Sequence, residues 1–191
     1  VEKALQSIGE DPVITRDEKT ILSADKVILP GVGSFGNAMK AIRDYGLDRV
    51  IRRVAEQGTP FLGICLGLQL LFERSQESPG VEGLGILKGE ILRLPETEGL
   101  KIPHMGWNTL SLSGNGRLFA GLPKEPSVYF VHSYYLKAAD ESIVRATAWH
   151  GATIHASVEQ GNLFACQFHP EKSGSVGLAI LRNFAALKKE D

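Results

Sequence analysis

The stretch Thr59–Phe72, TPFLGICLGLQLLF, decides the fold. The apolar run around Gly63 is typical of a buried strand, and the apolar residues after Gly67 are typical of a buried helix. Cys65 joins the two halves, and its Gly-x-Cys-x-Gly setting predicts a tight elbow that lifts the thiol toward solvent. A helix N-terminus behind the sulfur favours the thiolate and offers N–H groups to an oxyanion. The alternative is a cysteine buried in an apolar strand.

Composition favours one α/β domain over residues 1–191. The chain is 43% hydrophobic and 23% charged, and its net charge of −1 gives no reason to expect a nucleic-acid partner. No apolar run reaches the roughly 20 residues of a membrane helix. Cys65 and Cys166 have neither zinc-ligand spacing nor a disulfide framework, so we predict a cytoplasmic protein without a metal or cofactor.

Before Thr59 the sequence alternates between helical and strand-like segments. This alternation predicts a parallel sheet with helices on both faces. Helices are expected at 1–9, 37–45 and 47–57, strands at 12–15 and 26–29, and a glycine loop, PGVGSFG, at 30–36. The first helix starts abruptly at Val1, and we expect that a segment before it is missing.

After Ser75 glycines and prolines separate short strand-like runs. Such closely spaced runs predict antiparallel strands added to the sheet. They lie at 85–94, 109–112, 128–136, 143–149, 153–158 and 163–168, and an amphipathic helix at 175–187 closes the chain.

His169 and Glu171 lie in the segment FHPEKS near the end of the chain. Proline disfavours helix for the residue before it, so His169 is expected to be extended, and positions i and i+2 of an extended chain point to the same side. The Glu171 carboxylate then lies beside the imidazole, fixes its tautomer and stabilises the imidazolium. This pair would be the base that a Cys65 thiolate nucleophile needs. The alternative is a histidine in a surface loop.

The other histidines compete less well for this role. His104 and His132 stand beside proline or aromatic residues, where they are structural or line the site. His150 and His155 flank a Gly-Ala turn and are expected to be solvated. Cys166 shares a strand face with two phenylalanines and is expected in the core.

The loop Gly31-Val32-Gly33 follows a predicted parallel strand. Its N–H groups, at Val32 and Gly33, are candidates for the second half of an oxyanion hole, the first half being the N–H of Leu66. An ordinary glycine turn is the alternative. The loop lacks the lysine and the spacing of a P-loop.

Five segments, in order, carry a family resemblance: PGVGSF, GICLGLQLLFERS, IPHMGWN, YFVHSYY and FHPEKS. Together they resemble the class I (triad) glutamine amidotransferases and, in finer detail, the glutaminase subunits of imidazole glycerol phosphate synthases. The resemblance covers essentially the whole chain. It implies a three-layer, flavodoxin-like fold with a mixed central sheet.

The resemblance also implies an activity and its residues. Cys65 would attack the side-chain amide of glutamine, with His169 and Glu171 completing the triad. The residues that would hold the amino-acid end of glutamine are Gln69, Glu77, Ser133 and Tyr134.

The implied partner is a (β/α)8-barrel cyclase subunit in a heterodimer. It would receive the ammonia and form imidazole glycerol phosphate and AICAR in histidine biosynthesis. Trp107, Tyr129 and Lys172 match positions at the docking face and near the ammonia entrance.

One departure from the family pattern concerns the N-terminal end. The family begins with an apolar strand and a Gly-Asn turn, and neither is present here. That strand lies inside the sheet, so its absence would leave unpaired backbone groups in the core. No triad residue is lost.

Three other functions remain open. The chain could be a glutaminase for another biosynthetic pathway, a non-catalytic binding subunit of the same fold, or a cysteine peptidase acting on γ-glutamyl bonds. Glutaminase activity with and without a cyclase partner would separate them.

Overall fold

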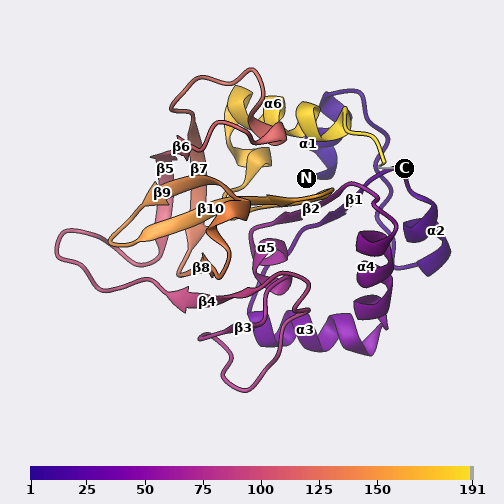
Figure 1. Cartoon of the computed structure of the whole chain (residues 1–191), viewed down its shortest axis with the longest axis horizontal. Coiled ribbons are helices and arrows are strands. Elements are labelled where there is room, and N and C mark those ends of the chain that lie inside the picture. The colour runs from indigo at the N-terminus through magenta and orange to yellow at the C-terminus, as the bar shows by residue number, and fades with distance from the viewer. Residues whose placement is uncertain (190–191) are drawn as a thin grey trace.

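A six-stranded mixed sheet runs through the centre of the computed structural model, which describes residues 1–189 (Figure 1). Its strands, in spatial order, are β1 (Val27–Leu29), β2 (Phe61–Ile64), β11 (Leu163–Cys166), β10 (Thr153–Gln160), β9 (Val144–Trp149) and β6 (Ser111–Leu112). The strands β1, β2 and β11 are parallel, and β10, β9 and β6 continue the sheet antiparallel. The predicted mixed sheet is therefore confirmed.

Helices cover both faces of this sheet, because its strands alternate side chains between two apolar clusters. Phe61 of β2 belongs to the cluster under α3 (Phe35–Asp44), α4 (Leu47–Glu56) and α5 (Leu66–Leu70). Leu62 belongs to the other cluster, which packs against α6 (Gly174–Ala185).

Smaller elements surround the central sheet. Two more sheets are formed by β3 (Arg74–Ser75), β4 (Gly89–Arg93) and β8 (Tyr134–Ala138), and by β5 (His104–Thr109) with β7 (Ser127–His132). The remaining helices are α1 (Glu2–Ser7), α2 (Glu18–Ser23), η1 (Arg117–Phe119), η2 (Glu141–Ile143) and η3 (Pro170–Lys172). Over residues 1–189, none of the helices is both long and apolar enough to cross a membrane.

Three sequence-based predictions of strands are wrong. The run 109–112 is divided between the end of β5 and β6, which lie in different sheets. Pro12–Thr15 forms no strand, and Val13 and Ile14 are 69% and 80% exposed. A strand needs a hydrogen-bonded neighbour, and β1 pairs only with β2 among the described residues. The run 128–136 is two strands rather than one. The strand β7 ends before Ser133, and the chain then continues as β8, which belongs to a different sheet.

The strand-to-helix elbow at Cys65 is confirmed. Cys65 has φ 56° and ψ −109°, and it is the only non-glycine residue with positive φ in the described part of the chain. The helix that follows lies so close to the sheet that a Cβ on Gly67 would come within 1.9 Å of the Leu29 carbonyl oxygen. A Cβ on Gly63 would meet the Gly67 carbonyl oxygen at 2.7 Å. The two flanking glycines are therefore required by close packing.

We predict that Gly67→Ala destabilises the protein by about 3 kcal/mol or more, since the atom in the way belongs to the backbone of strand β1 and cannot rotate aside as a flexible side chain could. The matched control is Gly80→Ala, where a Cβ meets nothing within 4 Å and only the left-handed φ of +82° is strained, at about 1 kcal/mol. Urea denaturation of both variants measures the difference. Equal losses of stability in the two variants would show that the backbone around Cys65 can shift to make room for the added Cβ.

Candidate active site

The parallel strands β2 and β11 bring the predicted triad together. Ile64 pairs with Cys166 in their register, so Cys65 and the segment leading to His169 leave the same edge of the sheet. The Cys65 N–H donates to the Cys166 carbonyl at 2.8 Å. The His169 N–H donates to the Tyr129 carbonyl of β7 at 3.0 Å, which ties the histidine loop to the neighbouring sheet.

Glu171 holds the imidazole of His169 as expected. Its Oε1 lies 2.7 Å from Nδ1 of His169, whose backbone is extended, with φ −99° and ψ 100°. Both side chains are mostly shielded from solvent, at 9% and 16% exposure. Nδ1 therefore carries a proton, and Nε2, which is buried without a hydrogen-bond partner among the described residues, is left for chemistry.

The electrostatics of the site favour a charged imidazole. Burial opposes the imidazolium, but the interactions with Cys65 and Glu171 outweigh it and raise the pKa of His169 to about 9. Burial likewise opposes the charged Glu171, and the hydrogen bond from His169 nevertheless lowers the pKa of that carboxyl.

The predicted oxyanion donors lie at the start of α5 and in the glycine loop. Leu66 is the first residue of α5, so its N–H has no partner within the helix. A Cβ on Gly31 would lie 2.9 Å from the Leu66 Cβ, so the loop packs directly against the elbow. Val32 is 90% exposed, and Gly33 has φ +92°.

The four residues expected to hold substrate do not form a single cluster of free side chains. Gln69 is buried, and its Nε2 donates to the Tyr134 carbonyl at 3.0 Å and to Gln167 Oε1 at 3.1 Å. The Glu77 carboxylate accepts the N–H of Phe35 at the start of α3, at 2.9 Å. Ser133 and Tyr134 follow β7, where the chain turns into β8.

The three residues expected at the docking face lie together. The rings of Trp107 and Tyr129 are 6.1 Å apart and nearly perpendicular, and Nζ of Lys172 lies 6.0 Å from the centre of the Tyr129 ring. Trp107 is 59% exposed.

Gln167 belongs to the site although no motif predicted it, and His155 is buried although it was expected in solvent. Gln167 is wholly buried, and its Nε2 lies 3.6 Å from the Cys65 sulfur. The available signal was a lone polar residue inside the apolar run LFACQF. His155, expected in solvent, is 8% exposed because its Nδ1 accepts the Ala138 N–H of β8. Cys166 lies in the core as predicted.

His104 and His132 form a buried hydrogen-bonded pair beside the site. Nδ1 of His104 lies 2.9 Å from Nε2 of His132, and His150 stacks on His104 with ring centres 4.1 Å apart. Burial, together with the neighbouring histidines, lowers the pKa of His104 to about 3. Burial lowers that of His132 to about 4, against a raising effect of the Tyr134 carbonyl. Both rings are therefore neutral at physiological pH.

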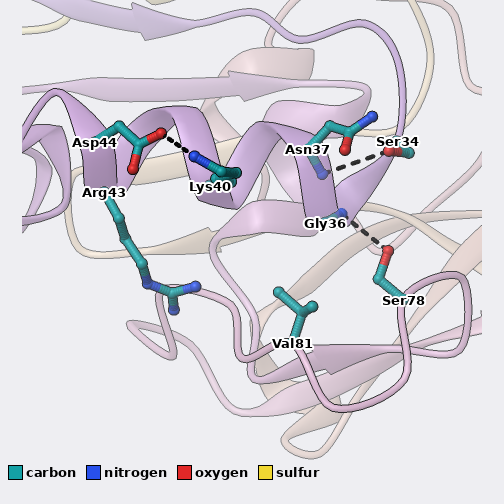
Figure 2. Close-up of a pocket in the computed structure, with 8 residues that line it drawn as sticks. All are labelled: Ser34, Gly36, Asn37, Lys40, Arg43, Asp44, Ser78 and Val81. Atoms are coloured by element: carbon teal, nitrogen blue, oxygen red, sulfur yellow. Dashed lines mark hydrogen bonds and ion pairs between the residues drawn. The ribbon is translucent and has the colours of Figure 1, made fainter.

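A surface hollow of about 500 Å³ lies between α3 and the loop that carries Ser78 (Figure 2). The Ser78 hydroxyl accepts the Gly36 N–H at 2.9 Å, Lys40 pairs with Asp44, and Arg43 donates to the Glu82 carbonyl. None of the residues predicted for the active site lines this hollow. Its lining residues Ser34 and Ser78 are the chain neighbours of Gly33 and Glu77.

Comparison with known proteins agrees with this geometry. The family described as Glutamine amidotransferase class-I matches residues 4–187. A crystal structure of a glutamine amidotransferase has a TM-score of 0.73 over 97% of this chain and 92% of its own, at 22% identity. The glutaminase domain of Trypanosoma brucei CTPS with bound acivicin has a TM-score of 0.66 over 96% and 84%, at 14% identity. These two similarities show the fold.

Sequence relatives narrow the family. The imidazole glycerol phosphate synthase subunit HisH of Thermosynechococcus vestitus is 53% identical over 100% of this chain and 91% of its own. The subunit HisH of Aquifex aeolicus is 49% identical over 96% and 88%. The chain therefore belongs to the class-I glutamine amidotransferases, a family of enzymes. Within that class it belongs to the family of imidazole glycerol phosphate synthase subunits HisH.

We predict that the free energy of unfolding falls as the pH is lowered from about 6.5 to about 4.5, because of the buried pair His104 and His132. In the unfolded chain both rings titrate near 6.5, so the unfolded state binds more protons than the folded state in this window, and stability falls as the pH falls. His169 contributes no slope here because it is protonated in both states below about 6.5. The free energy of unfolding of His104→Asn should fall less steeply across this window than that of the wild type. Equal slopes in His104→Asn and the wild type would contradict the conclusion that the buried His104 ring is neutral in the folded state.

Proposed function

We propose that this chain hydrolyses glutamine to glutamate and ammonia through the triad Cys65, His169 and Glu171. The ammonia passes to a (β/α)8-barrel cyclase subunit, which uses it to form imidazole glycerol phosphate and AICAR in histidine biosynthesis. The observation that carries the proposal is the strained Cys65 at the same edge of the sheet as an imidazole that Glu171 holds at 2.7 Å. The names of the HisH relatives support the pathway.

The geometry provides for each step of the reaction. The Cys65 thiolate attacks the side-chain amide carbon, and the Leu66 N–H at the start of α5 donates to the oxyanion that forms. When the C–N bond breaks, the His169 imidazolium gives its proton to the leaving ammonia. The neutral imidazole then takes a proton from water, whose oxygen attacks the γ-glutamyl thioester and releases glutamate and the thiolate. Glu171 stabilises the imidazolium before and after.

The substrate contacts follow from atoms that remain available. Both amide hydrogens of Gln69 are used by Tyr134 and Gln167, so Gln69 meets the substrate with its carbonyl oxygen. That oxygen and the Glu77 carboxylate suit the α-ammonium group of glutamine. Ser133 and Tyr134 add contacts from the turn between β7 and β8.

The face of β5 and β7 suits the partner. Met105 and Trp107 of β5 are 62% and 59% exposed, and large exposed apolar side chains on one strand mark a protein contact. The Tyr129 ring lies beside Trp107 and near the Lys172 ammonium, and the Tyr129 carbonyl accepts the His169 N–H. We therefore propose that the ammonia exit lies next to the docking face.

We predict that Cys65→Ala abolishes glutamine-dependent turnover, because it removes the proposed nucleophile and Cys166 is buried in the core. The variant should still bind the cyclase, and the complex should still turn over with added ammonium salt, since the cyclase chemistry lies in the partner. Steady-state assays with each nitrogen source measure both activities. Retention of glutamine use by the variant would make Cys65 structural, and failure of any barrel subunit to bind would favour another pathway.

The glycine loop supplies a second prediction, which concerns control. Gly33 lets the peptide beside Val32 rotate, so we infer that the N–H of Val32 points away in the isolated subunit and turns toward the oxyanion when the cyclase and its ligand bind. A missing oxyanion donor lowers the rate about 10²–10³-fold, so the lone subunit should be a poor glutaminase.

Stiffening this loop with Gly33→Ala should reduce the ratio of stimulated to basal glutamate release. Gly31→Ala should do so as well, although its Cβ also presses on Leu66. Gly121→Ala is the control, because Gly121 also has a positive φ, +74° against +92° for Gly33, and equally open surroundings elsewhere. Full activity of the wild-type subunit alone, or an unchanged ratio in Gly33→Ala, is the outcome that rejects this mechanism.

A further inference from the structure

A row of hydrogen bonds leads from the Cys65 sulfur into the protein interior. Nε2 of Gln167 lies 3.6 Å from the sulfur, and Oε1 of Gln167 accepts from Nε2 of Gln69 at 3.1 Å. Nε2 of Gln69 also donates to the Tyr134 carbonyl at 3.0 Å. The row therefore connects the proposed nucleophile to the backbone of β8.

The direction of every bond in this row is fixed by chemistry. A backbone carbonyl can only accept, so the Gln69 atom beside the Tyr134 oxygen is the amide nitrogen. That nitrogen can only donate, so the Gln167 atom that it meets is the carbonyl oxygen. The remaining polar atom of Gln167 is its NH₂ group, and this group faces the sulfur as a donor.

The far end of the row is held from a second side. Nδ1 of His132 lies 2.8 Å from the same Tyr134 carbonyl, so it carries the proton and Nε2 accepts from His104. Nε2 of His104 in turn meets Nδ2 of Asn108, which also donates to the Trp149 carbonyl. The Tyr134 oxygen is thus fixed between two chains of donors, and Gln69 cannot swing without losing its anchor.

The side chain of Gln167 is buried, so the loss of either of its two hydrogen bonds would leave a buried polar atom without a partner. It is 0% exposed, as are its neighbours Cys166 and Phe168, and a buried amide without partners is unfavourable by several kcal/mol. Its side chain satisfies this demand by bonding to Gln69 and to the sulfur of Cys65.

The donor matters most when the sulfur is charged. A thiol can donate to the Val131 carbonyl, which lies 4.0 Å from the sulfur, whereas a thiolate can only accept. The N–H of Gln167 at 3.6 Å is the closer contact, and hydrogen bonds to charged groups are about twice as strong as neutral ones. The NH₂ group of Gln167 is therefore placed to donate to the sulfur when the sulfur is a thiolate.

We propose that Gln167 is a positioning residue of the glutaminase site, which holds the Cys65 thiolate with its NH₂ group and fixes Gln69 with its carbonyl oxygen. The inference rests on the proposed function, because it concerns the nucleophile of that reaction. It gives one buried amide two tasks: the sulfur is kept ready to attack, and Gln69 is kept turned so that its own carbonyl oxygen faces the substrate.

Alkylation of the full-length chain by iodoacetamide tests this without measuring turnover. The thiolate is the reactive form, so the ratio of the rate at pH 7 to the rate at pH 10 reports how readily the sulfur ionises. In Gln167→Leu this ratio should fall about tenfold, the loss expected for one hydrogen bond to a charged group. In Gln167→Glu it should fall at least as far, because the acceptor for Gln69 remains while the donor to the sulfur is replaced by oxygen.

Two controls separate this role from a structural one. Asn162→Leu removes another buried amide, which bonds to the Gly58 and Lys188 carbonyls before β11, and it should leave the ratio unchanged. Cys65→Ala should remove the labelling, because Cys166 is 0% exposed. General loosening of the fold would raise the rate at both pH values and leave the ratio intact.

An unchanged ratio in both Gln167 variants overturns the inference, even if Cys65→Ala has lost glutamine use. Should leucine prevent folding, the isosteric glutamate variant decides the question by itself. Because labelling is independent of turnover, a failure of the proposed function and a failure of this inference give different results.

Discussion

The close contact between the Leu29 carbonyl of β1 and Gly67 of α5 is the constraint on which the site depends. No Cβ fits there, since it would lie 1.9 Å from the oxygen. The helix can therefore lie directly on the sheet, and the chain must turn within one residue to reach it. Cys65 takes the resulting strain, with φ 56°, and its side chain leaves the turn beside the free N–H groups of the helix.

Burial works against the charges of this site, and specific partners overcome it. The His169 imidazolium is favoured because Glu171 accepts a hydrogen bond from its Nδ1 and because Cys65 interacts with the ring as well. Gln167 belongs to the same arrangement, since a buried donor beside the sulfur favours negative charge there. Burial has the opposite outcome for the pair His104 and His132. Neither ring has a carboxylate partner, so burial lowers both pKa values and both rings stay neutral.

The mixed sheet brings distant parts of the chain to one edge. The strand β11 enters the sheet beside β2 and parallel to it, although about a hundred residues separate them in sequence. The antiparallel strands β10 and β9 continue the sheet beyond β11. The pair β5 and β7 lies apart from the central sheet and supplies Tyr129, whose carbonyl holds the His169 N–H. The histidine is thus positioned by two sheets at once.

The sequence by itself determined the features that depend on local geometry: the glycine-flanked elbow at Cys65, and the approach of Glu171 to His169 two positions away in an extended chain. It also carried the motifs that identify the family. Only the tertiary structure decided the row through Gln167, the burial of His155, and the failure of Pro12–Thr15 to form a strand. A hydrogen-bond partner or a neighbouring strand comes from residues far away in sequence, and no local pattern specifies which of them will arrive.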